Sequence, residues 1–338
     1  MPVSSARRPA TDLRRILVAA SPHAGARSRR GTVREIVALL DKGGYHVRAT
    51  EDIEELQGLA AEWHSAGQLR TVLACGGDGT ASLVRNRVPL AVPLLAVPMG
   101  TENLLGRYLS QSAEPASVLQ TVEEGVTVQL DLGSVQSGGR PADEVPSDGR
   151  YFLMMISAGF DAEVVRRLHD RRRGHVTRRS YVQPALAAIR SYQYPELQLY
   201  CGEDGSGGVE PVCCRWAFAF NLPLYACGWQ IAPDAVGTDA LFDICTFGRG
   251  SFLQTARYLW HVMRGKHLQL PDAQRIRHKR FRLEASDGGE VAFQLDGDCG
   301  GVLPVEVDLL PGELRLLVMP EVASALGFSA EMPTQRGE

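Results

Sequence analysis

The first part of the chain alternates short apolar runs with segments whose apolar residues recur every three or four positions. Runs of the first kind predict β-strands, and segments of the second kind predict helices. We predict strands at residues 15–20, 46–49, 72–75 and 94–97, and helices at 31–41, 53–66 and 115–124 with a short one after Asn103. Such alternation is typical of α/β units around a parallel sheet. The pattern therefore predicts an N-terminal α/β domain with a parallel sheet over residues 1–125.

Beyond Gly125 the pattern changes to β-like runs separated by turn residues. We predict strands at 126–132, 151–156, 197–201, 215–220, 241–247, 280–284, 291–295 and 303–310, with one helix at 182–192. Many short strands among turns are typical of a sandwich or a barrel. We therefore predict a mainly β (sandwich) C-terminal domain over residues 126–311. The hydrophilic segments 136–150 and 202–211 are expected to be exposed connections, and 329–338 a disordered tail.

Composition places the chain among ordinary globular proteins. Of its 338 residues, 44% are hydrophobic and 22% are charged, and the formal net charge is -3. These values argue against a disordered chain and against a dedicated nucleic-acid binder, which would be basic. We expect neither a signal peptide nor a membrane-spanning helix, because no apolar run is long enough. Seven cysteines without a CxxC pair indicate neither a zinc site nor a disulfide framework, so we expect reduced thiols in a cytoplasmic protein.

The strongest local signal is the string Gly76-Gly77-Asp78-Gly79-Thr80, which follows an apolar strand and precedes a helical segment. A glycine-rich turn at a helix start directs unpaired backbone N–H groups toward one spot, where a phosphate group would bind. A carboxylate at Asp78 would repel that phosphate unless a cation such as Mg²⁺ lay between them. The alternative is an ordinary turn in which Asp78 caps the helix. The GxGxxG and GxxxxGK patterns are both absent.

Two further polar loops follow predicted strands of the same sheet. The loop Pro98-Met99-Gly100-Thr101-Glu102-Asn103 follows one strand, and Ser21-Pro22-His23-Ala24-Gly25 follows the first. Because the carboxyl ends of parallel strands share one edge of a sheet, both loops should lie near the Gly76 turn. Thr101 and Asn103 could then reach the same ligand. The sequence thus predicts one site built from three strand ends.

Four strings taken together resemble a known family. They are the Gly76–Thr80 string, Pro98-x-Gly-Thr-x-Asn103, residues 157–162 (Ser-Ala-Gly-Phe-Asp-Ala), and residues 295–301 (Leu-Asp-Gly-Asp-Cys-Gly-Gly) with Leu303-Pro304. In this order they resemble the diacylglycerol kinase catalytic family, which includes bacterial diacylglycerol kinases, related lipid kinases and sphingosine kinases. The resemblance extends from about Arg15 to Pro320. It implies an ATP-binding α/β domain to which residues 312–328 return, and a β-sandwich domain that receives the lipid.

The resemblance also implies particular ligand residues. With Asn103 from the strand-end argument, the nucleotide site would comprise Ser21, Pro22, His23, Ala24, Gly25, Thr50, Gly76, Gly77, Asp78, Gly79, Thr80, Thr101 and Asn103. The family's magnesium loop falls on residues 232–241, where Asp239 would bind Mg²⁺ through its side chain and Val236 and Leu241 through their carbonyl groups. Trp229, just before this loop, is a candidate for the wall of a lipid pocket.

The family's Asp-Gly-Glu motif, whose glutamate accepts the proton, corresponds to Asp296-Gly297-Asp298. Asp298, Asp296 and Asp78 are therefore the candidate catalytic residues. Asp298 keeps the carboxylate but shortens the side chain by one methylene, a loss of reach that can slow a reaction by ~10²-fold. Ser21, Leu104 and Ala240 also depart from the family pattern. Outside the family context, Asp296 and Asp298 would be read as a solvated hairpin turn.

A basic segment interrupts the acidic chain, because residues 166–179 contain seven arginines. Anionic lipid attracts such clusters, so this segment could dock the protein on a membrane, peripherally on its inner face. The alternatives are a solvated connection whose arginines pair with acidic neighbours, and a contact of the arginines with ATP phosphate. An exposed sheet edge could also support a homodimer.

These observations favour an ATP- and Mg²⁺-dependent lipid kinase that transfers the γ-phosphate to a lipid hydroxyl, with diacylglycerol as the family default. An NAD kinase-like enzyme shares the Gly-Gly-Asp-Gly turn and is the second hypothesis. A nucleotide- or lipid-binding relative without catalysis is the third, because of the four departures at Ser21, Leu104, Ala240 and Asp298. No nucleic-acid partner is expected.

Overall fold

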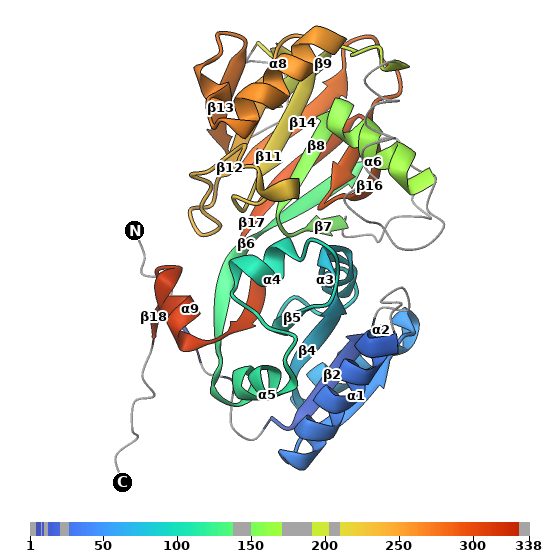
Figure 1. Ribbon diagram of the computed structural model, residues 1–338, viewed down its shortest axis with the longest axis vertical. Coiled ribbons are helices and arrows are strands. Elements are labelled where there is room, and N and C mark those ends of the chain that lie inside the picture. Colours follow the sequence, from blue (N-terminus) through green and yellow to red (C-terminus); the bar gives the residue numbers. More distant parts are fainter. Residues whose placement is uncertain are drawn as a thin grey trace. The chain divides into compact units, whose positions relative to one another are not determined.

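The computed structural model describes residues 5–7, 9, 13–20, 27–137, 150–170, 191–202 and 210–330. The chain divides into two compact units (Figure 1). Unit 1 comprises residues 1–130 and 312–338, and unit 2 comprises residues 131–311. Two long strands, β6 (Val126–Ser137) and β17 (Val305–Val318), carry the chain from unit 1 into unit 2 and back.

Unit 1 contains the predicted parallel sheet. Its strands are β2 (Arg15–Ala20), β3 (His46–Thr50), β4 (Leu69–Gly76) and β5 (Leu94–Pro98). They lie in the order β5-β4-β2-β3, and the end of β17 pairs with β5 in parallel. The central strand β4 is buried at every position, as its continuous apolar run predicts. Since all these strands run in one direction, their carboxyl ends share one edge of the sheet.

Helices flank this sheet. They are α1 (Arg27–Lys42), α2 (Ile53–Ser65), α3 (Asp78–Arg85), α4 (Leu104–Tyr108), α5 (Pro115–Glu124) and α9 (Pro320–Ala325). Helix α2 begins where the Asp52 carboxylate accepts the N–H groups of Glu54 and Glu55. Buried residues of the sheet and of α1, such as Val18, Leu73 and Leu40, form a shared core. The short strands β1 (Ser5–Ala6) and β18 (Ser329–Ala330) pair in parallel.

Unit 2 is mainly β, as predicted. One antiparallel sheet has the order β13-β12-β11-β8-β15-β16, formed by Ala273–His278, Phe242–Phe247, Trp216–Phe220, Met155–Gly159, Ala292–Leu295 and Asp298–Val302. A second set, β10-β9-β14-β17, is formed by Val212–Cys214, Leu197–Cys201, Arg280–Ala285 and β17, while β7 (Arg150–Phe152) pairs with β6. Phe242 and Ile244 of the first sheet and Phe281 and Leu283 of the second belong to one core.

Unit 2 also contains helices α6 (Phe160–Asp170) and α8 (Phe252–Met263) and the short 3₁₀ turns η2 (Ala226–Gly228) and η3 (His267–Gln269). Helix α8 was not predicted, because apolar residues occupy so many of its positions that no single stripe stands out. Its first turn is capped by the Ser251 hydroxyl, which accepts the N–H of Gln254. The helix predicted at 182–192 lies almost wholly outside the described residues.

Candidate functional site

The predicted phosphate turn lies where β4 ends and α3 begins. The neighbouring loop, which follows β5, is held to it by a 2.7 Å hydrogen bond from the Met99 N–H to the Gly76 carbonyl. A Cβ atom built on Gly100 would lie 2.5 Å from the Gly77 Cα, which no real side chain tolerates. A Cβ on Gly76 would lie 2.1 Å from the Thr80 hydroxyl oxygen. The two loops are therefore adjacent, as predicted, and their contact requires glycine.

This arrangement leaves a set of backbone donors at the carboxyl edge of the sheet. Helix α3 starts at Asp78, and Gly77 in the N-cap position has no side chain to satisfy the first N–H groups. The positive end of the helix adds to the attraction for an anion. A helix start and a close approach of two backbones are features of phosphate-binding turns, although the Thr80 N–H here already donates to the Gly77 carbonyl at 2.9 Å.

The Asp78 carboxylate contacts the start of a second helix. Its two oxygens accept the N–H groups of Leu104 and Leu105, at 2.9 and 3.0 Å, in the first turn of α4. Burial raises the pKa of Asp78, while these two hydrogen bonds act in the opposite direction. The two N–H groups of α4 therefore offset part of the cost of burying this carboxylate. Asp78 caps a helix, as the alternative reading held, but the helix is α4 and not α3.

The other predicted nucleotide residues have different roles. Asn103 accepts the Gly100 N–H through Oδ1 at 2.6 Å and donates through Nδ2 to the Gly100 carbonyl at 3.0 Å, so it shapes the loop. The Thr50 hydroxyl donates to the Glu55 carboxylate and accepts the Asp52 N–H. Thr101 is exposed in the loop. Ser21, Pro22, His23, Ala24 and Gly25 lie outside the described residues.

In unit 2, Asp296 and Gly297 form the two-residue turn of the hairpin β15–β16. Both have positive φ, 51° and 88°, as a type I′ turn requires. The Asp296 carboxylate accepts the N–H groups of Leu153, Met154 and Met155 at 2.7, 2.8 and 3.0 Å. The predicted hairpin turn is therefore present, but the Asp296 carboxylate is buried instead of solvated and holds the loop at 153–155.

Asp298 is the first residue of β16 and pairs with Leu295 across the turn. The residue is partly exposed. Of the two aspartates in this motif, Asp298 is thus the more exposed, and Asp296 holds the hairpin against the loop at 153–155.

The predicted magnesium residues are engaged within the protein. The Asp239 carboxylate pairs with Arg277 and accepts the Leu241 N–H at 3.1 Å. The Val236 carbonyl accepts the Asp239 N–H. Among the described residues, no group of three or more His, Cys, Asp or Glu side chains could hold a metal ion. A single carboxylate already neutralised by arginine does not fit a Mg²⁺ site, for which oxygen ligands without a competing cation are required.

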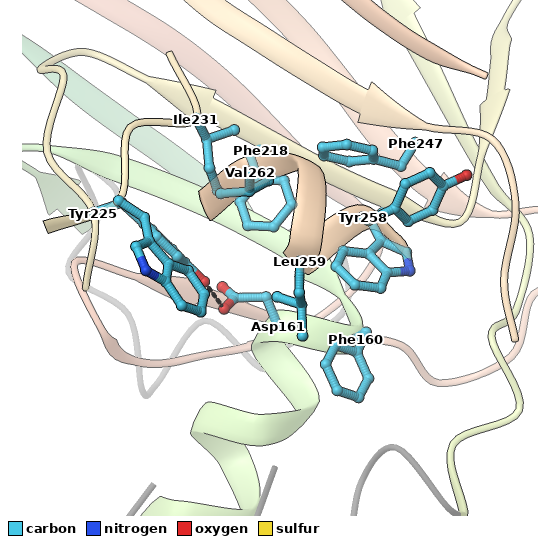
Figure 2. A pocket seen from close by; sticks show the side chains of 11 residues that line it. Phe160, Asp161, Phe218, Tyr225, Ile231, Phe247, Tyr258, Leu259 and Val262 are labelled. Atoms are coloured by element: carbon cyan, nitrogen blue, oxygen red, sulfur yellow. Dashed lines mark hydrogen bonds between the residues drawn. The ribbon is translucent and has the colours of Figure 1, made fainter. Parts of the chain in front are cut away.

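A small apolar pocket lies between α6, α8 and the strands β11 and β12 (Figure 2). Its wall contains Phe160, Trp216, Phe218, Tyr225, Trp229, Ile231, Phe247, Tyr258, Leu259 and Val262. The candidate Trp229 is among them. The cavity is about 40 Å³, far below the ~300–1,000 Å³ of typical ligand sites. An acyl chain could enter only if the wall moved.

One carboxylate, Asp161, faces this apolar pocket. It accepts a hydrogen bond from the Tyr225 hydroxyl group (Figure 2). It also accepts hydrogen bonds from the Ser157 hydroxyl group at 2.5 Å and from the Gln294 amide at 3.3 Å. Burial raises its pKa, and the three hydrogen bonds oppose that shift. The string 157–162 carries part of the family resemblance, but no role was predicted for Asp161. A carboxylate within so apolar a string was the signal that could have identified it.

Only part of the basic segment is described. Arg166 and Arg167 both pair with Glu163, at 2.8 and 2.6 Å, which is what the alternative reading expected of them. Residues 171–179 lie outside the described part of the chain. None of the helices that the structure describes has the length and apolar character needed to cross a bilayer.

Comparison with known proteins identifies the family. Residues 15–135 match the diacylglycerol kinase catalytic domain, and residues 154–318 match the YegS C-terminal NAD kinase beta sandwich-like domain. Residues 15–135 therefore belong to the diacylglycerol kinase catalytic domain family. This match confirms the family resemblance that the sequence motifs indicated.

Individual relatives carry the same name. The chain is 24% identical over 273 residues to a diacylglycerol kinase of Bacillus subtilis, covering 79% of this chain and 84% of that protein. It is 23% identical over 292 residues to a diacylglycerol kinase of Staphylococcus saprophyticus, covering 84% and 88%.

Solved structures show the same fold. A diacylglycerol kinase of Bacillus anthracis superposes with a TM-score of 0.60 at 15% identity, covering 93% of this chain and 99% of that chain. Yeast NADH kinase, solved with NADH, superposes with a TM-score of 0.52 at 11% identity, covering 99% and 94%. At these identities the structures establish the fold, an α/β domain followed by a β domain, and not the substrate.

Proposed function

We propose that this protein is an ATP-dependent lipid kinase that transfers the γ-phosphate of ATP to the hydroxyl group of a diacylglycerol-like lipid. One observation carries the proposal: the glycine-only contact between the Gly76–Thr80 turn and Gly100 at the carboxyl edge of the parallel sheet. Family membership supports a kinase with an alcohol acceptor.

The proposed work of unit 1 is to bind the phosphates of ATP. The first N–H groups of α3 would donate to the phosphate oxygens, and Gly77 and Gly100 would allow the nucleotide to approach the backbone closely. Asp78 would act indirectly. Its carboxylate holds the start of α4 and thereby positions the loop that carries Thr101. Phosphoryl transfer depends mainly on such positioning and on charge stabilisation.

The proposed work of unit 2 is to present the lipid. Asp298 would accept the proton of the lipid hydroxyl as its oxygen forms the new bond to the γ-phosphorus, while the bond from that phosphorus to the β-phosphate oxygen breaks and ADP leaves. Asp296 would keep the hairpin in place through its three backbone hydrogen bonds. The apolar pocket would widen to hold part of an acyl chain.

The residues 236–241 do not fit a Mg²⁺ site in this arrangement, so no step is assigned to a metal bound there. Mg²⁺ would enter with the nucleotide as its substrate complex.

Transfer of labelled γ-phosphate from Mg·ATP tests the proposal. The acceptors are diacylglycerol, monoacylglycerol, ceramide, a sphingoid base and phosphatidylglycerol in micelles, and NAD. The variants are Asp298→Asn and, as a matched control, Asp287→Asn, which alters an exposed aspartate in another turn of unit 2. We expect a labelled lipid with wild type and the control, and a loss of ~10²-fold or more with Asp298→Asn.

The other outcomes separate the competing hypotheses. Label on NAD alone would replace the lipid kinase with an NAD kinase-like enzyme. ATP binding without any labelled product would support a relative without catalysis. Full activity of Asp298→Asn would remove Asp298 from the mechanism.

A further inference from the structure

Helix α8 carries apolar side chains on two opposite faces. On the inner face, Tyr258, Leu259 and Val262 line the pocket of unit 2 (Figure 2). That face is also held by polar contacts, since the Thr255 and Tyr194 hydroxyl groups lie 2.6 Å apart and the Tyr258 hydroxyl donates to Asp272 at 2.7 Å. These contacts of the inner face hold α8 against the sheet. They do not account for the apolar side chains on the outer face.

The outer face exposes four large apolar side chains. The exposed fractions are 56% for Phe252, 75% for Leu253, 51% for Trp260 and 56% for Met263. In the described part of the chain, six large hydrophobic residues are exposed, and four of them are these. Their spacing along α8 places them on one side of the helix. Single exposed apolar residues are common, but a cluster of this kind indicates an interaction surface.

Positive charge borders this cluster. Between Asp243 and Asp272 the chain has no acidic residue, but it has Arg249, Arg257, Arg264 and Lys266. Asp272 forms ion pairs with Arg249 and Arg257. Arg264 and Lys266 are exposed and form no ion pair with any residue that the structure describes, and the Arg264 guanidinium lies 4.3 Å from the centre of the Trp260 ring.

We propose that the outer face of α8 docks the protein on an anionic lipid bilayer. Leu253, Trp260 and Met263 would enter the boundary between headgroups and acyl chains, where tryptophan is favoured, and Arg264 and Lys266 would contact anionic headgroups. The basic border favours this partner over a second copy of the chain, because two copies of the same face would bring like charges together. The proposal builds on the lipid kinase function, whose acceptor resides in a bilayer.

Binding to vesicles in the absence of nucleotide tests the docking surface. The vesicles contain phosphatidylcholine alone or with phosphatidylglycerol, and bound protein is measured by co-sedimentation. We expect the double variant Leu253→Gln/Trp260→Gln to bind the mixed vesicles at least ~10-fold more weakly, because two apolar side chains no longer enter the bilayer. Leu83→Gln is the matched control, since Leu83 is 47% exposed on α3, and it should bind like wild type.

The charge contribution has its own variant. Arg264→Gln/Lys266→Gln should weaken binding to vesicles with phosphatidylglycerol by roughly 10-fold and should reduce its dependence on salt. Equal binding of wild type and the Leu253/Trp260 variant to mixed vesicles would overturn the docking surface. So would a dimer in sedimentation experiments that Trp260→Gln converts to a monomer, because the face would then bind a second copy.

Fluorescence locates the contact. Brominated phospholipid should quench wild type more than Trp260→Phe, and the difference reports on Trp260 alone. Trp260 that is already shielded from acrylamide without lipid would contradict the proposal, because another part of the protein would cover it. Vesicle binding needs no ATP, so the docking proposal can hold even if the protein transfers no phosphate. Conversely, if the variants bind vesicles as wild type does, the docking proposal fails and the proposed kinase function is unaffected.

Discussion

The two units use different parts of the chain to build their candidate sites. In unit 1 the site consists of backbone, where the Gly76 and Gly100 loops meet without side chains and leave N–H groups at the start of α3. In unit 2 the site consists of side chains, with Asp298 on a hairpin and an aromatic pocket assembled from several elements. A backbone site depends on a short glycine string and tolerates little change, whereas the side chains that line a pocket can be exchanged one at a time.

The aspartates of the two units sharpen this contrast. Asp78 and Asp296 both belong to short motifs that resemble catalytic ones, and both are saturated by backbone N–H groups of a distant segment. Each therefore holds a loop in place. Asp298 differs from Asp296 because it is partly exposed, and it differs from Asp78 because it lies at the start of a strand.

The largest effect is expected from Gly100→Ala. The new Cβ would lie 2.5 Å from the Gly77 Cα, so the two loops must separate and the phosphate donors move. We expect ATP affinity to fall by ~10²-fold or more, as measured by equilibrium binding. Gly58→Ala in α2 is the control, because nothing lies within 4 Å of its new Cβ. Normal ATP binding by Gly100→Ala would break the backbone interpretation of unit 1.

Asp296→Ala should lower the stability of the protein. The change leaves the N–H groups of Leu153, Met154 and Met155 without their carboxylate, at ~1–3 kcal/mol for each buried group left unpaired. We expect the free energy of unfolding in urea to fall by about 3 kcal/mol or more. Asp298→Ala should abolish transfer with little change in that free energy. A stable but inactive Asp296→Ala would instead make Asp296 the catalytic residue.

Asp161→Asn should change how stability depends on pH. Burial raises the pKa of Asp161 above its ordinary value of 3.8 in the folded protein. Below that value the carboxyl is protonated in both states. As the pH rises through the raised pKa, the unfolded chain ionises more readily, so the wild type loses stability that the asparagine variant keeps.

Urea unfolding of both proteins between about pH 4 and 7 measures this difference. Asp78, whose pKa burial also raises, is present in both and cancels. Parallel pH profiles of wild type and Asp161→Asn would show that the pocket carboxylate does not titrate in this range.

Ser251→Ala should have the smallest effect. The Ser251 hydroxyl accepts the Gln254 N–H at the start of α8, and loss of such a cap costs about 1 kcal/mol. Amide hydrogen exchange should increase in the first turn of α8 and stay unchanged in α2, whose cap is Asp52. If exchange in the first turn of α8 were the same in the variant and in wild type, α8 would not depend on its cap.

Much of the fold was predictable because local patterns determine it. The observed bounds of the strands predicted at 15–20, 72–75 and 94–97 differ from the prediction by at most a few residues. This agreement arises because the spacing of apolar residues in a strand or helix reflects the geometry of its own backbone. The Gly76–Thr80 and Gly100 strings were found for a similar reason, because only glycine permits the backbone contact. Helix α8 was missed because both its faces are apolar.

The partners of individual side chains needed the tertiary structure. Asp78 caps a helix 26 residues further along the chain, and Asp296 binds backbone groups 143 residues away. The pocket around Asp161 is lined by residues of α6, β11, β12 and α8. Asp239, whose carboxylate was predicted to bind Mg²⁺, forms an ion pair with Arg277. Periodicity and glycine strings act within a few residues and are visible in the sequence. The partner of a buried carboxylate depends on strand order and on packing summed over the whole unit, which only the folded chain decides.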